Sequence, residues 1–135
     1  MIRRLARGDG GQLRELDRRF KEHVPSMQTA EDFLADPGHV VLVAGEHEGF
    51  LLAYVMPRID GRTAVFLYEV GVAEQSQRRG LGRALVEEAK AIARDTGAFE
   101  MYVLTEPDNR PANALYAATG ATAQDACVMW TWTFR

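Results

Sequence analysis

The chain has 135 residues, of which 47% are apolar and 26% charged, with a formal net charge of −3. This length suits one globular domain, residues 1–135, with a substantial core. The small negative charge argues against a nucleic-acid-binding protein, which usually carries a strong basic excess.

Cysteine and histidine content narrows the class further. A single cysteine, Cys127, excludes an internal disulfide framework and favours a reducing, cytoplasmic location. His23, His39 and His47 lack metal-ligand spacing among themselves or with Cys127, so we expect no metal. The pattern shows no signal peptide and no membrane span, and we expect no membrane partner.

The first half of the chain predicts a strand, two helices and three antiparallel strands. Asp9 is the expected cap of the first helix, whose apolar residues recur at helical spacing, and Thr29 is the expected start of the second. Pro37 and Gly38 end that second helix. The expected strands are residues 2–6, 40–44, 50–56 and 64–72.

The second half predicts a crossover unit. A helix over residues 80–96 leads to a strand over 99–105, which must return parallel to residues 64–72. A last helix is expected over 111–119. Residues 126–134 then alternate between apolar aromatic and smaller side chains, which predicts a final strand.

The most informative stretch lies between strand and helix at residues 72–85. It contains Gln77, Gly80 and Gly82 in the pattern Gln-x-x-Gly-x-Gly, with arginines on both sides. The first N–H groups of a helix are unpaired and carry a partial positive charge, so glycines there can cradle a phosphate or pyrophosphate. The spacing fits neither a dinucleotide nor a nucleoside triphosphate loop, and an ordinary glycine turn is the alternative.

These pieces together resemble the GCN5-related N-acetyltransferases. Residues 77–82 are similar to that family's acetyl-CoA pyrophosphate loop, and residues 69–72 to the strand whose backbone pairs with the pantetheine arm. Residues 109–120 resemble its Asn-x-x-Ala-x-x-x-Tyr-x-x-x-Gly helix. The resemblance implies an α/β fold with a central mixed sheet flanked by helices, and acetyl-CoA as co-substrate. The residues it implies for acetyl-CoA binding are Val70, Gly71, Val72, Gln77, Arg78, Arg79, Gly80, Leu81, Gly82, Arg83, Asn109 and Tyr116.

Residues 32–120 are most similar to the type I aminoglycoside 3-N-acetyltransferases. The likeness implies an aminoglycoside acceptor acetylated at the 3-amino group. Glu69 and Glu106 stand where those enzymes typically carry aspartates, and Asn109 and Arg110 where they carry acidic residues. These departures bear on the acceptor and leave the acetyl-CoA chemistry untouched.

The resemblance also implies roles in catalysis. An ammonium is not a nucleophile, so a carboxylate must take its proton, directly or through water, and Glu69 is our candidate. The backbone N–H of Val70 or Val72 would hold the thioester oxygen. Tyr116 is the candidate acid for the departing thiolate, although packing alone could explain a tyrosine there. Cys127 lies in an alternating segment and is expected to be a buried structural cysteine, so we expect direct attack without an acetyl-enzyme.

An amine-rich acceptor calls for carboxylates around the site. The candidates for acceptor binding are Glu69, Glu106, Asp108, Asp125 and Asp60. Two alternatives remain open at this point. One is an enzyme of the same fold that acetylates a protein lysine or N-terminus or another small amine, and the other is a non-catalytic acyl-CoA-binding module. The aromatic stripe of residues 126–134 favours a homodimer.

Overall fold

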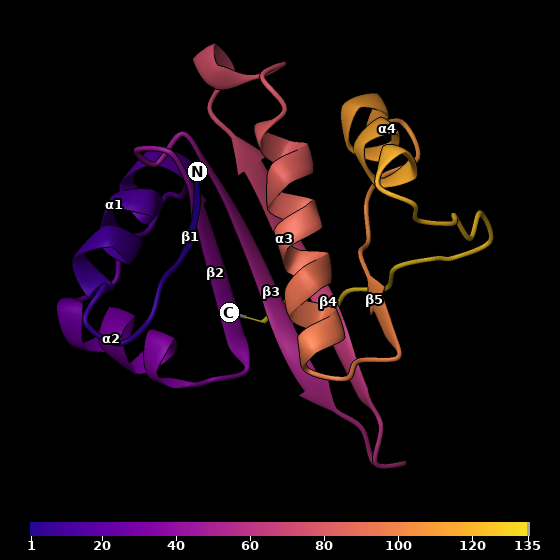
Figure 1. The fold of residues 1–135 in the computed structure, drawn as a ribbon, viewed down its shortest axis with the longest axis horizontal. Helices are drawn as coiled ribbons and strands as arrows, with labels where there is room; N and C mark the ends of the chain where they lie inside the picture. Colours follow the sequence, from indigo (N-terminus) through magenta and orange to yellow (C-terminus); the bar gives the residue numbers. More distant parts are fainter. Residues whose placement is uncertain (135) are drawn as a thin grey trace.

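The computed structural model describes residues 1–134 and shows a mixed sheet with helices on both faces (Figure 1). The strands lie in the order β1-β2-β3-β4-β5. Their bounds are β1 Ile2–Arg4, β2 His39–Ala44, β3 Gly49–Pro57, β4 Thr63–Val72 and β5 Glu100–Tyr102. The helices are α1 Gly10–Phe20, α2 Met27–Ala35, the short 3-10 helix η1 Glu74–Ser76, α3 Leu81–Asp95 and α4 Arg110–Ala118. Within the described part of the chain, no helix combines the length and apolarity needed to cross a membrane.

Two separate cores hold the layers together, one on each face of the sheet. Helix α3 packs across one face through Leu85, whose side chain is fully buried beside Leu42 and Leu67. Helices α1 and α2 cover the other face, where Leu16 and Leu34 pack against the intervening residues of β2. Alternate residues of β2 therefore point into opposite cores. Because both faces of this strand are buried, its sequence is a continuous apolar run.

The predicted crossover is confirmed: β4, α3 and β5 form a parallel unit. The two strands pair only from Ala64↔Glu100 to Phe66↔Tyr102. Strand β5 ends there, whereas β4 continues to Val72. From Leu67 onward, the backbone groups of β4 that point toward β5 therefore have no ladder partner on that side.

A β-bulge interrupts β4 at Tyr68. Leu52 of β3 is paired with Glu69, and Ala53 with Leu67, which leaves Tyr68 as an extra residue. Leu67 and Val70 both join the core under α3, while Tyr68 and Glu69 both line cavities on the opposite side of the strand. The bulge thus turns Glu69 away from the face that strict alternation would assign to it.

The start of α2 differs from the prediction. Thr29 was expected to begin this helix, but the helix begins at Met27 and the hydroxyl of Ser26 accepts a hydrogen bond from the Thr29 N–H at 3.1 Å. Asp9 is indeed the residue before α1, yet its carboxylate accepts from the Ala6 N–H at 2.9 Å and makes no cap bond to the helix. Both serine and threonine can cap a helix, so the sequence allowed either register.

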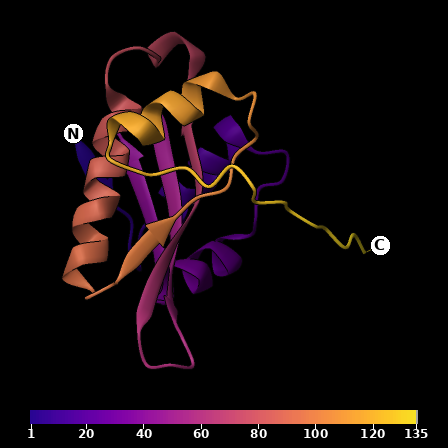
Figure 2. The ribbon, with the colours of Figure 1, turned by 90° about the vertical axis from the view of Figure 1, so that its right-hand side faces the viewer.

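The predicted final strand is wrong: residues 126–134 form no strand. The segment leaves the body of the molecule and ends in solvent (Figure 2). Trp130 and Trp132 are 81% and 78% exposed. Cys127 is exposed as well, so the expectation of a buried structural cysteine is wrong. A strand needs a neighbour to satisfy its backbone, and this segment has no ladder partner within residues 1–134. Its alternating pattern is therefore present without the pairing that it predicts.

The packing of β4 yields a stability prediction for Gly71→Ala. A Cβ at Gly71 would lie 2.5 Å from Cε1 of Phe50. Phe50 is buried against Phe20, with ring centroids 4.8 Å apart, and cannot move aside freely. We expect a loss of about 1–3 kcal/mol in the free energy of unfolding, measured by urea denaturation. Gly11→Ala is the matched control: its Cβ meets only Met27 at 3.9 Å, so it should be neutral or stabilising. Unchanged stability of Gly71→Ala would contradict this view of the packing.

Candidate active site

The glycine loop leads into an uncapped helix start. Gly80, the residue before α3, has a φ of +78°, and no side chain caps the helix. Nothing lies within 4 Å of the position that a Cβ on Gly80 would occupy. Arg78 also has a positive φ, of +67°. The first N–H groups of α3 thus have no side-chain cap, and the start of the helix has a backbone arrangement that suits an anion.

Gly82 lies in the first turn of α3, close to side chains of α4 and β4. A Cβ there would lie 3.4 Å from Cδ2 of Leu115 and 3.9 Å from a methyl group of Val72. A Cβ at this position would make ordinary van der Waals contacts, so α4 packs against the first turn of α3 with little space to spare for a larger side chain. This packing places α4 beside the loop, at the end of β4 where the gap to β5 opens (Figure 1).

Polar side chains anchor the loop to the rest of the molecule. Glu48, in the turn between β2 and β3, accepts hydrogen bonds from the Arg79 guanidinium at 2.9 Å and the Ser76 hydroxyl at 3.0 Å. The Ser76 hydrogen bond, with the Arg79 charge, lowers the pKa of Glu48. The Gln77 amide donates to the Val72 carbonyl at 3.2 Å. Gln77 and Arg79 thus hold the loop in shape.

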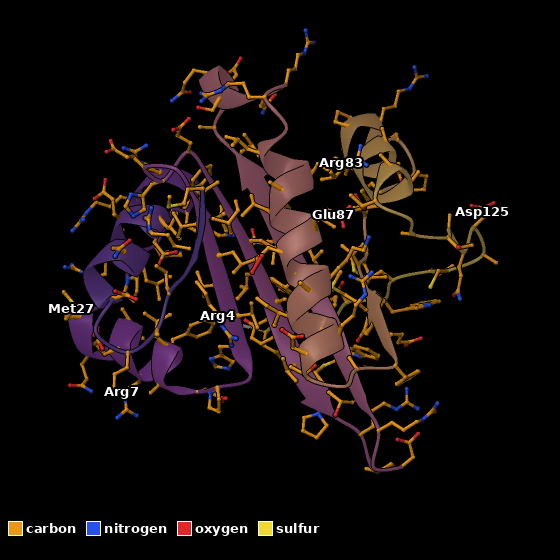
Figure 3. All side chains as sticks on the ribbon, in the orientation of Figure 1. Arg4, Arg7, Met27, Arg83, Glu87 and Asp125 are labelled. Carbon is orange, nitrogen blue, oxygen red and sulfur yellow. The ribbon has the colours of Figure 1, made fainter. Side chains whose placement is uncertain are left out.

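The two remaining arginines are available to an anion. Arg78 and Arg83 are both exposed, and Figure 3 shows Arg83 on the first turn of α3, on the side toward α4. A pyrophosphate at the helix start would therefore meet backbone N–H groups and these two guanidinium groups. The residues present fit the diphosphate of acetyl-CoA.

Helix α4 positions Tyr116. Its start is capped by Asn109, whose side-chain oxygen accepts from the Ala112 N–H at 3.2 Å. Tyr116 packs against the core beneath α3, and this burial raises the pKa of its phenol. The phenol is therefore protonated at neutral pH, as a proton donor must be. Packing and proton donation are compatible roles for this side chain.

Glu69 carries an unexpected partner. The Lys21 ammonium, at the end of α1, forms an ion pair with the Glu69 carboxylate. The same ammonium lies 5.7 Å from the ring centroid of Phe50. Both side chains are only partly exposed, at 37% for Lys21 and 29% for Glu69. The carboxylate that we selected as a base therefore already holds a cation of the chain itself.

Two cavities meet at this ion pair. One, of about 270 Å³, lies between the sheet and helices α1 and α2, and its charged lining residues are Asp17, Lys21 and Glu69. The other, of about 360 Å³, opens over β4 and includes Lys21, Glu69, Tyr68 and Met129. The ion pair between Lys21 and Glu69 thus lines both cavities. At this position an amine of a ligand could replace the lysine ammonium beside the carboxylate.

Aromatic rings cover the sheet beside the second cavity. Tyr68 makes edge-to-face contacts with Tyr54 and Phe66, whose ring centroids lie 5.9 Å and 5.6 Å away. Phe66 in turn stacks on Tyr102 at 4.9 Å. This platform is a surface on which the apolar face of a sugar or an alkyl chain could rest, and it can attract cations through its ring faces.

Comparison with known proteins decides the family. Residues 11–121 match the model of the acetyltransferase (GNAT) family. The chain belongs to the GNAT acetyltransferases. A mycothiol acetyltransferase of Arthrobacter sp. (strain FB24) is 36% identical over 104 residues, which are 75% of this chain and 32% of that protein. The chain spans about a third of the length of the curated relatives that it matches first.

Solved structures show the same GNAT fold. The aminoglycoside acetyltransferase meta-AAC0020, from an uncultured soil metagenomic sample and in complex with sisomicin, aligns with a TM-score of 0.90 at 23% identity. The alignment covers 100% of this chain and 96% of that chain. Aminoglycoside N-acetyltransferase AAC(6')-Iy in complex with CoA aligns with a TM-score of 0.79 at 20% identity, covering 98% and 93%.

The predicted acceptor carboxylates of this GNAT chain do not gather in one place. Glu106 and Asp108 are exposed in the loop before α4, and Asp125 points outward beyond α4 (Figure 3). Asp60 lies in the turn between β3 and β4, paired with Arg62 at 3.0 Å. That turn is at the opposite end of β4 from the glycine loop, so the structure does not bring Asp60 to the site. The carboxylate of Glu69 is paired with Lys21 instead of lying in a cluster with these four acids.

Sequence reasoning missed Lys21 and Asp17, although one signal was available. Positions 13, 16, 17 and 20 lie on the face of α1 that turns toward the sheet, so Asp17 is a charged residue at a position where the helical pattern expects an apolar one. Burial raises the pKa of Asp17, which Lys21 opposes and Glu69 reinforces. A charged side chain on the core-facing side of a helix is therefore a sequence signal for a candidate functional site.

The raised pKa of Asp17 gives a pH-dependent prediction. Because the folded state holds this proton more tightly than the unfolded state, the contribution of Asp17 to stability falls as pH rises above its unfolded pKa of about 3.9. Asp17→Asn should therefore be more stable than the wild type at pH 7, with the difference vanishing at lower pH. The midpoints of urea unfolding of the two proteins, compared at pH 7 and at a pH below the unfolded pKa of Asp17, measure this difference in stability. Lower stability of the variant at pH 7 would mean that pairing with Lys21 outweighs burial.

Proposed function

We propose that this chain transfers the acetyl group of acetyl-CoA to a primary amine of a small, amine-rich acceptor by direct attack in a ternary complex. One observation carries the proposal. Glu69 lines the cavities on one side of β4, immediately before residues 70–72, whose backbone edge borders the gap to β5. Because the candidate base, Glu69, directly precedes the strand edge that would bind the pantetheine arm, the acceptor amine and the thioester would be held next to each other.

The residues have distinct roles in this mechanism. When bound, acetyl-CoA supplies an activated thioester. Residues 80–82 with Arg78 and Arg83 bind its diphosphate, and the free edge of β4 from Val70 to Val72 binds the pantetheine arm. Glu69 takes the proton of the acceptor ammonium, directly or through water. The N–H of Val70 or Val72 hydrogen-bonds the thioester oxygen, and Tyr116 donates a proton to the leaving sulfur.

The favoured acceptor is an aminoglycoside, acetylated at its 3-amino group. The solved GNAT structures named as aminoglycoside acetyltransferases support this choice through the fold. The cavity under α1 and α2 supports it through chemistry, because Asp17 and Glu69 provide two carboxylates at one wall. A polyamine can replace the Lys21 ammonium at Glu69 and keep the charges balanced.

A second acceptor class has its own support. The curated relatives at 34–36% identity include several mycothiol acetyltransferases. We therefore keep a mycothiol-type acceptor as the second candidate. Acetylation of a protein lysine or N-terminus is a third candidate, which the lysine peptide in the assay below tests. We also propose that the chain is a homodimer.

Acetyl-CoA-dependent thiol release from the purified protein tests these proposals. Gentamicin, kanamycin, spermidine and a lysine peptide should be run as separate acceptors, with a reaction lacking acceptor as the blank. A thiol-bearing amine of the mycothiol type is run as a fifth acceptor, and its acetylation is detected by mass spectrometry because its own thiol would mask the release of CoA. Turnover on gentamicin supports the aminoglycoside proposal. Absence of turnover on every aminoglycoside would overturn that acceptor, and absence of acetyl-CoA binding by calorimetry would overturn the enzyme proposal itself.

A further inference from the structure

Lysine is rare in this chain, and one of its lysines lies at the candidate base. Among the 16 lysines and arginines, only Lys21 and Lys90 are lysines. A guanidinium keeps its proton, whereas a lysine amine becomes a nucleophile once its proton is removed. In an acetyltransferase, a lysine amine held beside the base is chemically equivalent to the amine of an acceptor. The position of Lys21 therefore bears on what the enzyme can acetylate.

The backbone fixes Lys21 at the end of α1. Its N–H donates a hydrogen bond to the Asp17 carbonyl at 2.9 Å, which closes the last turn of the helix. The side chain lies over the ring of Phe50, with the ammonium 5.7 Å from the ring centroid. Phe50 is buried and packs against Phe20. A rigid apolar surface thus directs the ammonium toward β4.

The ammonium meets Glu69, as the amine of an acceptor would. It forms an ion pair with this carboxylate, and both residues line both of the cavities beside β4. The two side chains are partly exposed, so a ligand that enters either cavity reaches them. Glu69 directly precedes Val70, the first residue of the strand edge proposed to bind the pantetheine arm. An amine of the protein itself is therefore held between the base and the place of the thioester.

The second lysine has a similar partner but a different place in the fold. The Lys90 ammonium pairs with the Glu87 carboxylate at 2.9 Å and donates to the Thr119 carbonyl at 2.8 Å. It belongs to α3, which covers the opposite face of the sheet from α1. Both lysines are thus paired with a carboxylate, and only the carboxylate beside Lys21 is the candidate base. Lys90 is a matched internal control for the position of Lys21.

We propose that the enzyme acetylates its own Lys21 side chain when acetyl-CoA is bound without an acceptor. This inference rests on the acetyl transfer proposed above. Glu69 takes a proton from the ammonium, and the lone pair freed on Nζ attacks the thioester carbonyl carbon. The new C–N bond forms as the C–S bond breaks. Of the three ammonium protons, one stays on the amide, one ends on the sulfur of CoA and one is released to water.

Acetylation changes the charge at the site. The amide nitrogen of an acetylated lysine carries no charge, so the ion pair with Glu69 is lost. The cavity under α1 and α2 then keeps the acidic side chains Asp17 and Glu69 without the ammonium that faced them. Because the nucleophile and the base belong to one chain, the reaction is intramolecular. Its rate per chain is therefore independent of the protein concentration.

Mass spectrometry of the full chain incubated with acetyl-CoA alone tests the inference. Cleavage after glutamate separates residues 16–22, which contain Lys21, from residues 89–100, which contain Lys90. We expect Lys21 to be acetylated at least about tenfold faster than Lys90, at a rate that dilution of the protein leaves unchanged. Equal rates at the two lysines, or a Lys21 rate that falls on dilution, would overturn the inference.

Paired variants then test the role of the base. Glu69→Gln should slow acetylation of Lys21 at least about tenfold, because an amide cannot take the proton. Glu22→Gln is the matched control: it removes the carboxylate of an exposed residue next to Lys21 in the sequence, and it should change the rate by less than about threefold. Equal effects of the two variants would overturn the inference.

Binding of acetyl-CoA, measured by calorimetry on the same preparation, separates this inference from the proposed function. Binding without acetylation of Lys21 overturns the inference alone. Absence of binding overturns the proposed enzyme as well. Acetylation of Lys21 in a preparation that turns over none of the tested acceptors supports the inference and leaves only the acceptor to be found.

Discussion

Replacing Glu69 by glutamine should reduce kcat for acetyl transfer by about 10²–10⁴-fold, with little change in the KM for acetyl-CoA. An amide cannot take the proton of an ammonium, and positioned bases contribute factors of this size. The KM should hold because the carboxylate of Glu69 is paired with Lys21 at the end of α1 and not with the glycine loop. Steady-state kinetics with whichever acceptor supports turnover provide the measurement.

The ion pair with Lys21 supplies the control for this variant. Glu69→Gln removes a base and also breaks the pair, whereas Lys21→Met breaks the pair and keeps the carboxylate. Partly exposed ion pairs contribute only about 0–1 kcal/mol, so both variants should fold. Lys21→Met should retain kcat and lower the KM of a polycationic acceptor, because the competing ammonium is gone. An equal loss of kcat in both variants would remove Glu69 from the role of base.

Replacing Tyr116 by phenylalanine should lower kcat by roughly ten- to a hundredfold. The change removes only the phenolic hydroxyl. A thiol, with a pKa of about 8.5, leaves more readily than an alcohol and depends less on a proton donor. The loss of kcat should therefore lie at or below the lower end of the range of about 10²–10⁴-fold that general acids contribute. The ring still packs against the core under α3, so the melting temperature should change little. Kinetics and thermal unfolding of the same preparation separate the two roles.

Tyr102→Phe is the matched control, because Tyr102 is an exposed tyrosine of β5 that stacks on Phe66. It should leave kcat within about twofold of wild type. If Tyr116→Phe also kept full kcat, packing would be the whole function of Tyr116. If it instead unfolded the chain, the expectation of simple ring packing would be wrong.

Much of the fold could be predicted because local signals and tertiary packing agree. The β4–α3–β5 crossover follows from an apolar run, a glycine loop and an amphipathic helix in succession, and the structure confirms it. The final strand could not be predicted correctly, because alternation describes a side-chain pattern and not the presence of a partner. Residues 126–134 have the pattern, yet no strand of the described chain pairs with them.

The candidate site was predictable in part, for a comparable reason. Motif spacing identified the glycine loop, but spacing could not show that Arg79 is held by Glu48 rather than facing outward. The bulge at Tyr68 was also hidden, because a bulge depends on the register with β3. Lys21 meets Glu69 across 48 positions of sequence, a separation at which no local pattern connects two side chains.

Glu48 couples two segments that are distant in the chain. Its carboxylate joins the turn between β2 and β3 to Ser76 and Arg79 of the glycine loop, while its backbone carbonyl accepts from the Ala73 N–H at 2.8 Å. Opening of the loop must therefore break contacts with the turn, so amide hydrogens of both segments should exchange as one cooperative unit. Slower exchange caused by a ligand at the loop would then extend into the N-terminal half of the sheet.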